Sequence, residues 1–278
     1  MNNMKPTKGY RAFQVINTII MIFVIFITLY PFVYLVAQSF SSDAAASAGK
    51  VTFYPIGFNV NTYKYILRDN QFFRYYGNTI FYTVVGTFIS VACTALIAYP
   101  LSKPRLRLNK VITPLVVFTM YFAGGMIPNY IVITQWLGLQ DSMWSIILPN
   151  AISTFNLLVM KSFFAGLPEE LEEAAAIDGM NTYQIFLKII IPLSKPIISV
   201  VAIFAITAAW SDFLLPYLVL NGTDKVTVMV KLFSFKDTPT DAVSVLRASF
   251  FAIIPPTILF TIFQKQITDG AATGAVKG

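Results

Sequence analysis

VINTIIMIFVIFITLYPFVYLVA, residues 15–37, is a run without a charged side chain near the amino terminus of the chain. A helix needs roughly 20 mainly apolar residues to cross a hydrocarbon core ~30 Å thick, so this run is long enough. It predicts a transmembrane helix over 13–37. The alternative is a cleaved secretory signal, because basic residues precede the run and small residues follow it. The run is longer than the roughly 7–15 apolar residues of a signal core, which favours an uncleaved anchor.

The rest of the sequence has the same character. Of its 278 residues, 56% are hydrophobic and 12% are charged, whereas a soluble domain has roughly 45–50% and 25%. Runs with few or no charges predict further spans at 78–99, 111–134, 143–163, 197–220 and 246–266. Prolines such as Pro128 and Pro149 either kink these spans or mark their ends. We therefore predict an all-α integral membrane protein of about six transmembrane helices, forming one domain over 1–278.

The sequence lacks the residue types that most catalytic and metal sites need. It contains no histidine and a single cysteine, Cys93, which excludes Ser-His-Asp triads, histidine zinc sites and intrachain disulfides. It has no GxxxxGK(S/T) phosphate loop either, so any ATP hydrolysis belongs to a partner. The net charge of +7 does not indicate nucleic-acid binding, because the basic residues lie mostly in loops. We predict no enzymatic activity, cofactor or metal in this chain.

The distribution of basic residues predicts the orientation of the spans. The short loop between the second and third spans contains Lys103, Arg105, Arg107 and Lys110, and short basic loops face the cytoplasm. An even number of spans then places both termini in the cytoplasm. The predicted external segment 38–77 also carries basic residues, against this rule, but long loops have little influence on orientation.

The longest predicted cytoplasmic loop, 165–196, contains PEELEEAAAIDGMNTYQIFLKIIIPLSKP. Pro168 and the glutamates after it favour the start of a helix, and Gly179 favours its end. A second helix with one apolar face is expected from about Thr182 to the residue before Pro192. The loop therefore predicts two short helices that meet at a glycine turn.

This loop resembles that of a known family. Binding-protein-dependent ABC importer permeases share the pattern Glu-Ala-Ala, three residues, Gly, nine residues, Ile-x-Leu-Pro. The matching residues, with the acidic residue before the glycine, are Glu173, Ala174, Ala175, Asp178, Gly179, Ile189 and Pro192. The one departure is Ile191 in place of leucine. In this family the loop docks into a cleft of a cytoplasmic ATPase and couples it to transport; an amphipathic loop that only covers the helix bundle is the alternative.

The resemblance extends over nearly the whole chain and points to the sugar-importer branch, the smaller permease of maltose-type systems and its relatives for complex oligosaccharides. FAGGMIPNYIVITQWLGLQDSMWSIILP at 122–149 and GAATGAVKG at 270–278 also carry it. In maltose-type relatives the carboxyl-terminal tail reaches the ATPase dimer interface, which assigns that role to Gly274, Lys277 and Gly278. A disordered terminus of small residues is the alternative.

The resemblance also implies partners and a location. The expected complex contains a second homologous permease, two cytoplasmic ATPases that bind ATP and Mg²⁺, and an extracellular solute-binding protein, in the lipid of a bacterial cytoplasmic membrane. Closure of the ATPases would move the docked loop and switch a cavity between outward and inward access. The expected cargo is a large oligosaccharide, acidic ones included. The alternatives are an importer permease for another solute and a membrane scaffold that does not transport.

The fifth span contains candidates for the substrate pathway. They are Trp210, Asp212, Phe213 and Tyr217. An ionisable group at membrane depth usually faces a cavity or a partner, but Asp212 would lie near the outer headgroups if the span ended early. Aromatic rings at these depths either stack on sugars or serve as packing and interface residues. Both alternatives stay open.

Overall fold

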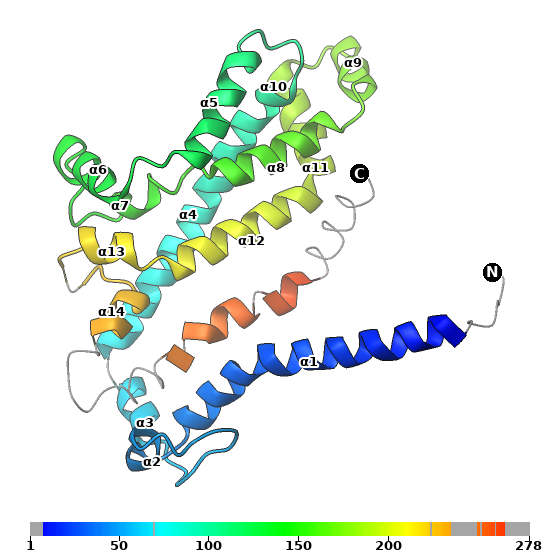
Figure 1. The fold of residues 1–278 in the computed structure, drawn as a ribbon. Helices are drawn as coiled ribbons and strands as arrows, with labels where there is room; N and C mark the ends of the chain where they lie inside the picture. Colours follow the sequence, from blue (N-terminus) through cyan, green and yellow to red (C-terminus); the bar gives the residue numbers. More distant parts are fainter. Residues whose placement is uncertain are drawn as a thin grey trace. The chain divides into compact units, whose positions relative to one another are not determined.

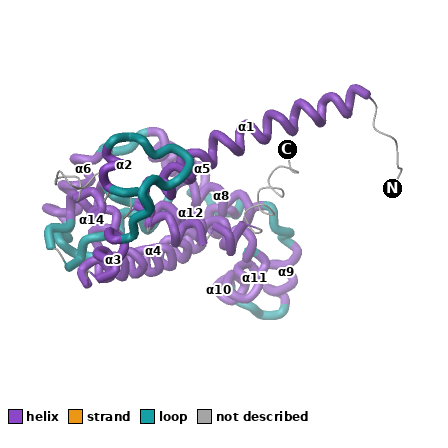
Figure 2. The backbone as a smooth tube through the Cα atoms, turned by 90° about the horizontal axis from the view of Figure 1, so that it is seen from below, coloured by secondary structure: helices purple, strands orange, loops and turns teal. Residues whose placement is uncertain are grey.

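The computed structural model describes residues 8–68, 70–222, 224–234, 249–250, 252–258 and 260–264. Throughout these ranges the chain forms helices, turns and loops, without a strand, as Figure 1 and Figure 2 show. The all-α prediction is confirmed. The chain divides into two compact units, Met1–Asp69 with Leu232–Ala252 and Asn70–Lys231 with Ile253–Gly278.

The first unit contains the predicted first span. Its helices are α1 (Lys8–Ser39), α2 (Asp43–Ser47) and α3 (Asn61–Arg68). Most large apolar side chains of α1 are exposed, as expected of a helix that lies in lipid. At the carboxyl end of α1, Ala37 is buried in a small cluster with Ala45 of α2 and Val51. The predicted anchor is therefore one long apolar helix followed by a short segment that packs against its carboxyl end.

Three helices form the framework of the second unit: α4 (Asn70–Ser102), α8 (Thr154–Ala165) and α12 (Lys195–Ser211). α4 lies against both of the others (Figure 1). Ala95 and Ala98 of α4 are buried in one cluster with Leu157 and Met160 of α8 and Val201 of α12. Small side chains let helix backbones approach closely, which is how helices pack when lipid surrounds them.

Shorter elements join these helices. They are α5 (Asn109–Tyr121), α6 (Met126–Ile131), η1 (Val132–Trp136), α7 (Trp144–Ile147), α9 (Glu170–Ile177), α10 (Thr182–Ile185), η2 (Phe186–Ile190), α11 (Ile191–Leu193) and α13 (Leu214–Val219). η1 and η2 are single π-helical turns. α14 (Val228–Ser234) contains the sequence boundary between the two units.

Length and apolar composition mark two described helices as able to cross a membrane, Gly9–Ser39 and Gln71–Ser102. Two bent pairs of helices raise the number to four if each counts as one span: Asn109–Tyr121 with Met126–Trp136, bent by 111°, and Thr182–Leu193 with Lys195–Ser211, bent by 80°. Thr154–Ala165 and Ala252–Gln264 are shorter apolar helices. Each predicted span overlaps one of these helices, and the total of about six stays a prediction.

The structure divides three of the predicted spans, 111–134, 143–163 and 197–220. Between α5 and α6 the chain turns at Gly125, whose φ of +90° suits glycine and strains other residues. Between α7 and α8 it turns after Pro149, and Ser153 caps α8 by accepting from the Asn156 N–H. α12 ends at Asp212, whose backbone is extended. Apolar runs indicate residence in lipid but do not reveal such local turns.

Candidate coupling site

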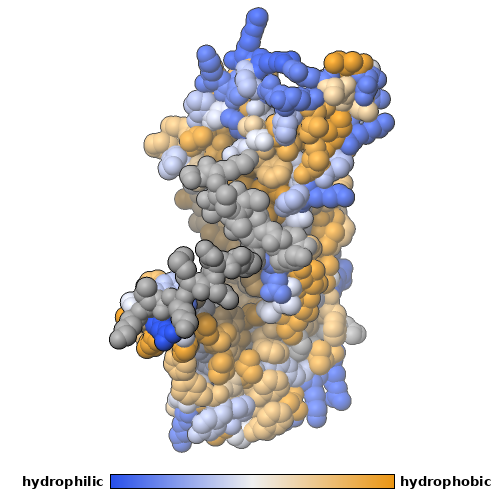
Figure 3. All heavy atoms as spheres, turned by 90° about the vertical axis from the view of Figure 1, so that its right-hand side faces the viewer, coloured by the Kyte–Doolittle hydropathy of each residue, from blue (hydrophilic) through white to orange (hydrophobic). Residues whose placement is uncertain are grey.

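The loop 165–196 forms two helical segments at one end of the second unit, where Figure 3 shows hydrophilic side chains gathered. The first segment, α9, has Glu170, Glu172 and Glu173 in its first turn. Carboxylates stabilise this end of a helix because the backbone dipole is positive there.

The first segment ends at the predicted glycine turn. Gly179 has a φ of +84°. Its N–H donates to the Ala176 carbonyl at 3.1 Å, and the N–H of Met180 donates to the Ala175 carbonyl at 3.0 Å. This pair of bonds is the Schellman motif, in which the residue after the cap adopts the left-handed conformation. The turn is confirmed, and its geometry requires glycine or a residue that tolerates positive φ.

The second segment starts as predicted and ends later than predicted. Asn181 and Gln184 form a capping box at the start of α10, each side chain accepting from the other residue's backbone N–H. The helix continues through η2 and α11 to Leu193 instead of ending before Pro192. Pro192 lies in the first turn of α11, directly after the π-helical turn, where a missing N–H is tolerated.

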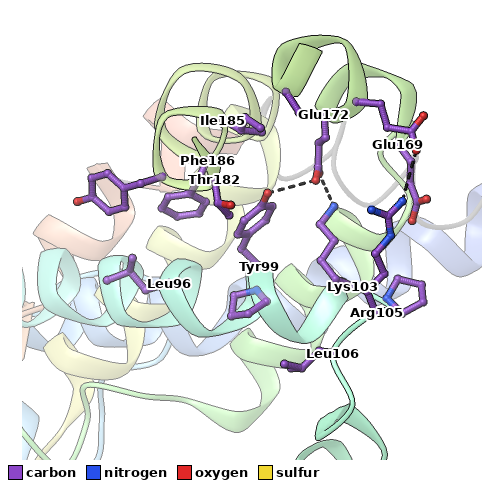
Figure 4. A pocket seen from close by; sticks show the side chains of 15 residues that line it. Leu96, Tyr99, Lys103, Arg105, Leu106, Glu169, Glu172, Thr182, Ile185 and Phe186 are labelled. Carbon is purple, nitrogen blue, oxygen red and sulfur yellow. Dashed lines mark hydrogen bonds and ion pairs between the residues drawn. The ribbon is translucent and has the colours of Figure 1, made fainter. Parts of the chain in front are cut away.

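Glu172 joins α9 to the carboxyl end of α4. One of its carboxylate oxygens accepts a hydrogen bond from the Tyr99 hydroxyl at 3.2 Å, and the other pairs with the Lys103 ammonium group (Figure 4). The side chains of Glu172 and Lys103 are only 18% and 22% exposed. Breaking so shielded a pair leaves a charge without its partner in a poorly solvated place, which is costly.

An apolar contact supports this polar one. The ring of Phe186, in η2, lies 5.1 Å from the ring of Tyr99 between centroids, a distance typical of favourable aromatic pairs. Around these groups lies a cavity of about 760 Å³, bounded by Leu96 of α4, by Lys103 directly after α4, and by residues of both helical segments. Both segments are therefore attached to α4, one through charge and one through packing.

Glu173 has an exposed partner within the chain. One oxygen of its carboxylate lies 3.4 Å from the Arg105 guanidinium, and the two side chains are 61% and 82% exposed. Such a pair in water contributes roughly 0–1 kcal/mol. Glu173 is therefore accessible to another protein, and exchanging Arg105 for a different cation costs little.

The other motif residues divide into buried and exposed ones. Ala175 is 3% exposed, in the same cluster as Phe186, and Ile189 is half-buried. Ala174 and Asp178 are exposed. Between them Ile177 is 86% exposed, an apolar side chain at the carboxyl end of α9. The motif therefore presents one face to its own helix bundle and one face outward.

Comparison with known proteins decides the family. The family of binding-protein-dependent transport system inner membrane components matches residues 1–270 of the chain. The chain belongs to this family. It is 37% identical to the protein LplC of Bacillus subtilis, over 100% of the chain and 99% of that protein. It is 34% identical to the polygalacturonan/rhamnogalacturonan transport system permease YtcP of the same organism, over 91% of the chain and 93% of that protein.

A solved structure supports the same conclusion. A permease chain of a bacterial ABC transporter involved in the import of the acidic polysaccharide alginate is 31% identical to this chain. The TM-score is 0.85, over 93% of this chain and 98% of the other. The protein is a multi-pass inner-membrane permease subunit of an ABC importer. It is not an enzyme, because ATP hydrolysis belongs to a separate subunit.

The four residues predicted for the substrate pathway lie in different surroundings. Trp210 is 3% exposed and packs edge-on against Tyr76, with centroids 5.6 Å apart. Phe213 and Tyr217 stack on each other at 5.5 Å. Asp212 lines a cavity, where one of its carboxylate oxygens accepts a hydrogen bond from the Asn150 side-chain amide at 3.2 Å. The structure thus brings Asp212 to an open space and Trp210 into the core.

The predicted residues of the carboxyl-terminal tail lie outside the residues that the structure describes. Residues that attach the coupling loop to α4 were not predicted. Gly274, Lys277 and Gly278 fall in the undescribed segment 265–278. Sequence reasoning used Lys103 for orientation alone and Glu172 for the start of the helix alone, and it passed over Tyr99. A signal was present, because Tyr99 and Lys103 are four residues apart and therefore share one helix face.

Proposed function

We propose that this permease carries oligosaccharides. The observation that supports this most is similarity over nearly the full chain to permeases whose names state such cargo: polygalacturonan/rhamnogalacturonan for YtcP, and arabinooligosaccharides for AraQ of Halalkalibacterium halodurans, 27% identical over 92% of the chain. The similar alginate transporter also imports a polysaccharide. The cargoes in these names are all chains of sugar residues, which carry many hydroxyl groups.

We also propose how the chain couples ATP to transport. A cytoplasmic ATPase, which binds ATP and Mg²⁺, would receive the exposed face of α9, with Glu173 offered to a basic group of its cleft. Closure of two ATPases would move α9, and the pair between Glu172 and Lys103 would carry that movement into α4. Because α4 packs on α8 and α12, the helices that border the pathway would follow.

The proposed orientation places both termini and the loop 165–196 in the cytoplasm. Support comes from two ion pairs between the predicted cytoplasmic loops, Lys103 with Glu172 and Arg105 with Glu173. Residues so paired lie on one side of the membrane, and Lys103 and Arg105 belong to the short basic loop that positive-inside bias assigns to the cytoplasm. A second permease and an extracellular solute-binding protein complete the proposed complex.

Transport by the reconstituted importer tests this function. The chain, its second permease, the ATPases and the binding protein are placed in proteoliposomes with ATP inside, and uptake of labelled oligosaccharides is compared with that of peptides and free amino acids. We expect uptake of an oligosaccharide that requires both ATP and the binding protein. Uptake of a peptide or an amino acid in place of every oligosaccharide would overturn the proposed cargo.

A further inference from the structure

Two cavities follow each other along α12 in the second unit. The first, about 440 Å³, is bounded by Asn129, Asn150 and Asp212 among others. The second, about 510 Å³, is bounded by Asn150, Ser153 and small residues of α12. Asn150 and Ala208 border both. The two cavities therefore adjoin at Asn150 and Ala208, and we refer to them together as the track.

The track lies where the predicted spans are broken. The turn between α7 and α8 supplies Asn150, and the end of α12 supplies Asp212. Non-helical backbone at membrane depth is stable only where protein covers it or where it lines a water-filled space. Exposed polar side chains at these breaks, those of Asn129, Asn150 and Ser211, fit a water-filled space. These features favour a hydrated track.

The polar groups on the track suit sugar hydroxyls. The Asn150 amide nitrogen donates to the Ile146 carbonyl at 3.1 Å and to the Asp212 carboxylate at 3.2 Å, which fixes its orientation. A carboxylate accepts several hydrogen bonds through two oxygens, and a primary amide both donates and accepts. Sugar hydroxyls both donate and accept, so fixed groups of this kind can bind them as they replace water.

The charged side chains that line the track have one sign, which is negative. Among the described residues that line the two cavities, Asp212 is the one acidic residue, and none is lysine or arginine. A carboxylate on a sugar would therefore meet a like charge without a cation to offset it in this chain. We propose that the track is a sugar subsite of this permease for neutral sugar residues, and that Asp212 selects against residues carrying a carboxylate. This inference rests on the proposed oligosaccharide cargo.

The substitution Asp212→Asn separates the effect of the negative charge from the effect of side-chain shape. Asparagine has nearly the same shape, and it ranks with aspartate as a helix-capping residue. This matters because the Leu215 N–H, in the first turn of α13, donates to the Asp212 carboxylate. The track and the break are therefore expected to keep their shape in the variant, whereas the repulsion is removed. Asp212→Ala, which also removes the hydrogen bond to the Leu215 N–H, would not separate the two effects.

The test is protection of a cysteine on the track. In a Cys93→Ser background of the assembled importer, Ser211→Cys is labelled with a thiol reagent in the presence of galacturonate oligosaccharides of one length, either fully methyl-esterified or de-esterified. These probes differ in charge at each residue. We expect the neutral ester to protect at a concentration roughly tenfold lower than the acid does. In Asp212→Asn the two should protect at similar concentrations.

Gln140→Cys, on an exposed loop residue that borders neither cavity, is the control and should be labelled equally with and without sugar. Protection by the acid at a concentration equal to or below that of the ester in the unsubstituted track would overturn the inference, as would an ester-to-acid ratio that Asp212→Asn leaves unchanged. Absence of protection by either probe, with oligosaccharide uptake intact, would overturn the subsite while keeping the proposed function. Absence of oligosaccharide uptake would refute the proposed function itself.

Discussion

The Tyr99 hydroxyl lies 3.2 Å from a carboxylate oxygen of Glu172, 73 positions further along the chain. Tyr99 belongs to α4, the helix that contacts α8 and α12, and Glu172 belongs to α9, which carries the family motif. Because Lys103 pairs with the same carboxylate, Glu172 holds α9 to the helix bundle through two partners. This contact joins the helix that carries the motif to the apolar helices.

Glu172→Ala is expected to uncouple ATP hydrolysis from transport. The substitution leaves Lys103 and the Tyr99 hydroxyl without their partner in a largely shielded place, which costs about 1–3 kcal/mol. The assembled importer should retain ATPase activity but transport fewer sugar molecules per ATP hydrolysed, measured in proteoliposomes. Glu170→Ala, on an exposed side chain of the same helix, is the matched control. An unchanged ratio in both variants would assign the contact to local folding alone.

Glu173→Lys is expected to weaken binding of the ATPase more than Glu170→Lys does. Both changes reverse a charge on exposed positions of α9, but Glu173 occupies the motif position. The contact with Arg105 is exposed, so its loss should change the stability of the isolated permease by less than about 1 kcal/mol. Co-purification of the ATPase measures binding. Restoration of binding by an acidic substitution in the ATPase would identify the pair, and equal binding by the two variants would argue against a special role for Glu173.

Gly179→Val is expected to disturb the turn between the two helical segments, and Gly179→Asn much less. A side chain added at Gly179 meets no atom within 4 Å, so crowding is not the reason. The φ of +84° is the reason, because a left-handed conformation costs an ordinary residue roughly 1–2 kcal/mol and asparagine tolerates it better. Insertion into the membrane should survive in both variants. ATP-dependent uptake should fall in the valine variant, and equal uptake by both would contradict this account.

The sequence predicted the parts of this fold that depend on composition and local pattern. Uncharged runs located the apolar helices, and the spacing around Gly179 located the turn of the coupling loop. The break at Gly125 escaped, and those at Pro149 and Asp212 stayed one of two alternatives, because mean hydropathy over a span is nearly unchanged by a turn inside it. Pairs such as Tyr99 with Glu172 escaped for another reason, since contacts between residues far apart in sequence depend on how helices pack.

Site-selective labelling tests the proposed orientation. Single cysteines at positions 107 and 175 should react only with reagent added on the cytoplasmic side, and one at 140 only with reagent added outside, after Cys93 is replaced. Ala175 is 3% exposed, so exposed Ala174 is the better reporter in the coupling loop. Labelling of position 140 from the cytoplasm would overturn the orientation argued from the basic loop that contains Lys103 and Lys110.

The last prediction concerns Asp141, in the loop between α6–η1 and α7. The Gly222 N–H donates to its carboxylate at 2.9 Å and the Lys225 ammonium group at 3.1 Å, and these bonds, the Gly222 bond foremost, hold the pKa of Asp141 below its usual range. A carboxyl group whose pKa is lower in the folded state stabilises the fold above its unfolded pKa of about 3.9, and this contribution disappears as pH falls through the folded value.

Asp141 has a positive φ of 53°, which asparagine tolerates, so Asp141→Asn removes the charge without straining the backbone. We expect the variant to lower the Tm of the detergent-purified importer at neutral pH and to differ less from the unsubstituted protein at pH 3, which lies below the unfolded pKa, so that part of the stabilisation is lost. A Tm difference that stays constant from pH 7 to pH 3 would show that the charge of Asp141 does not hold Gly222 and Lys225 in place.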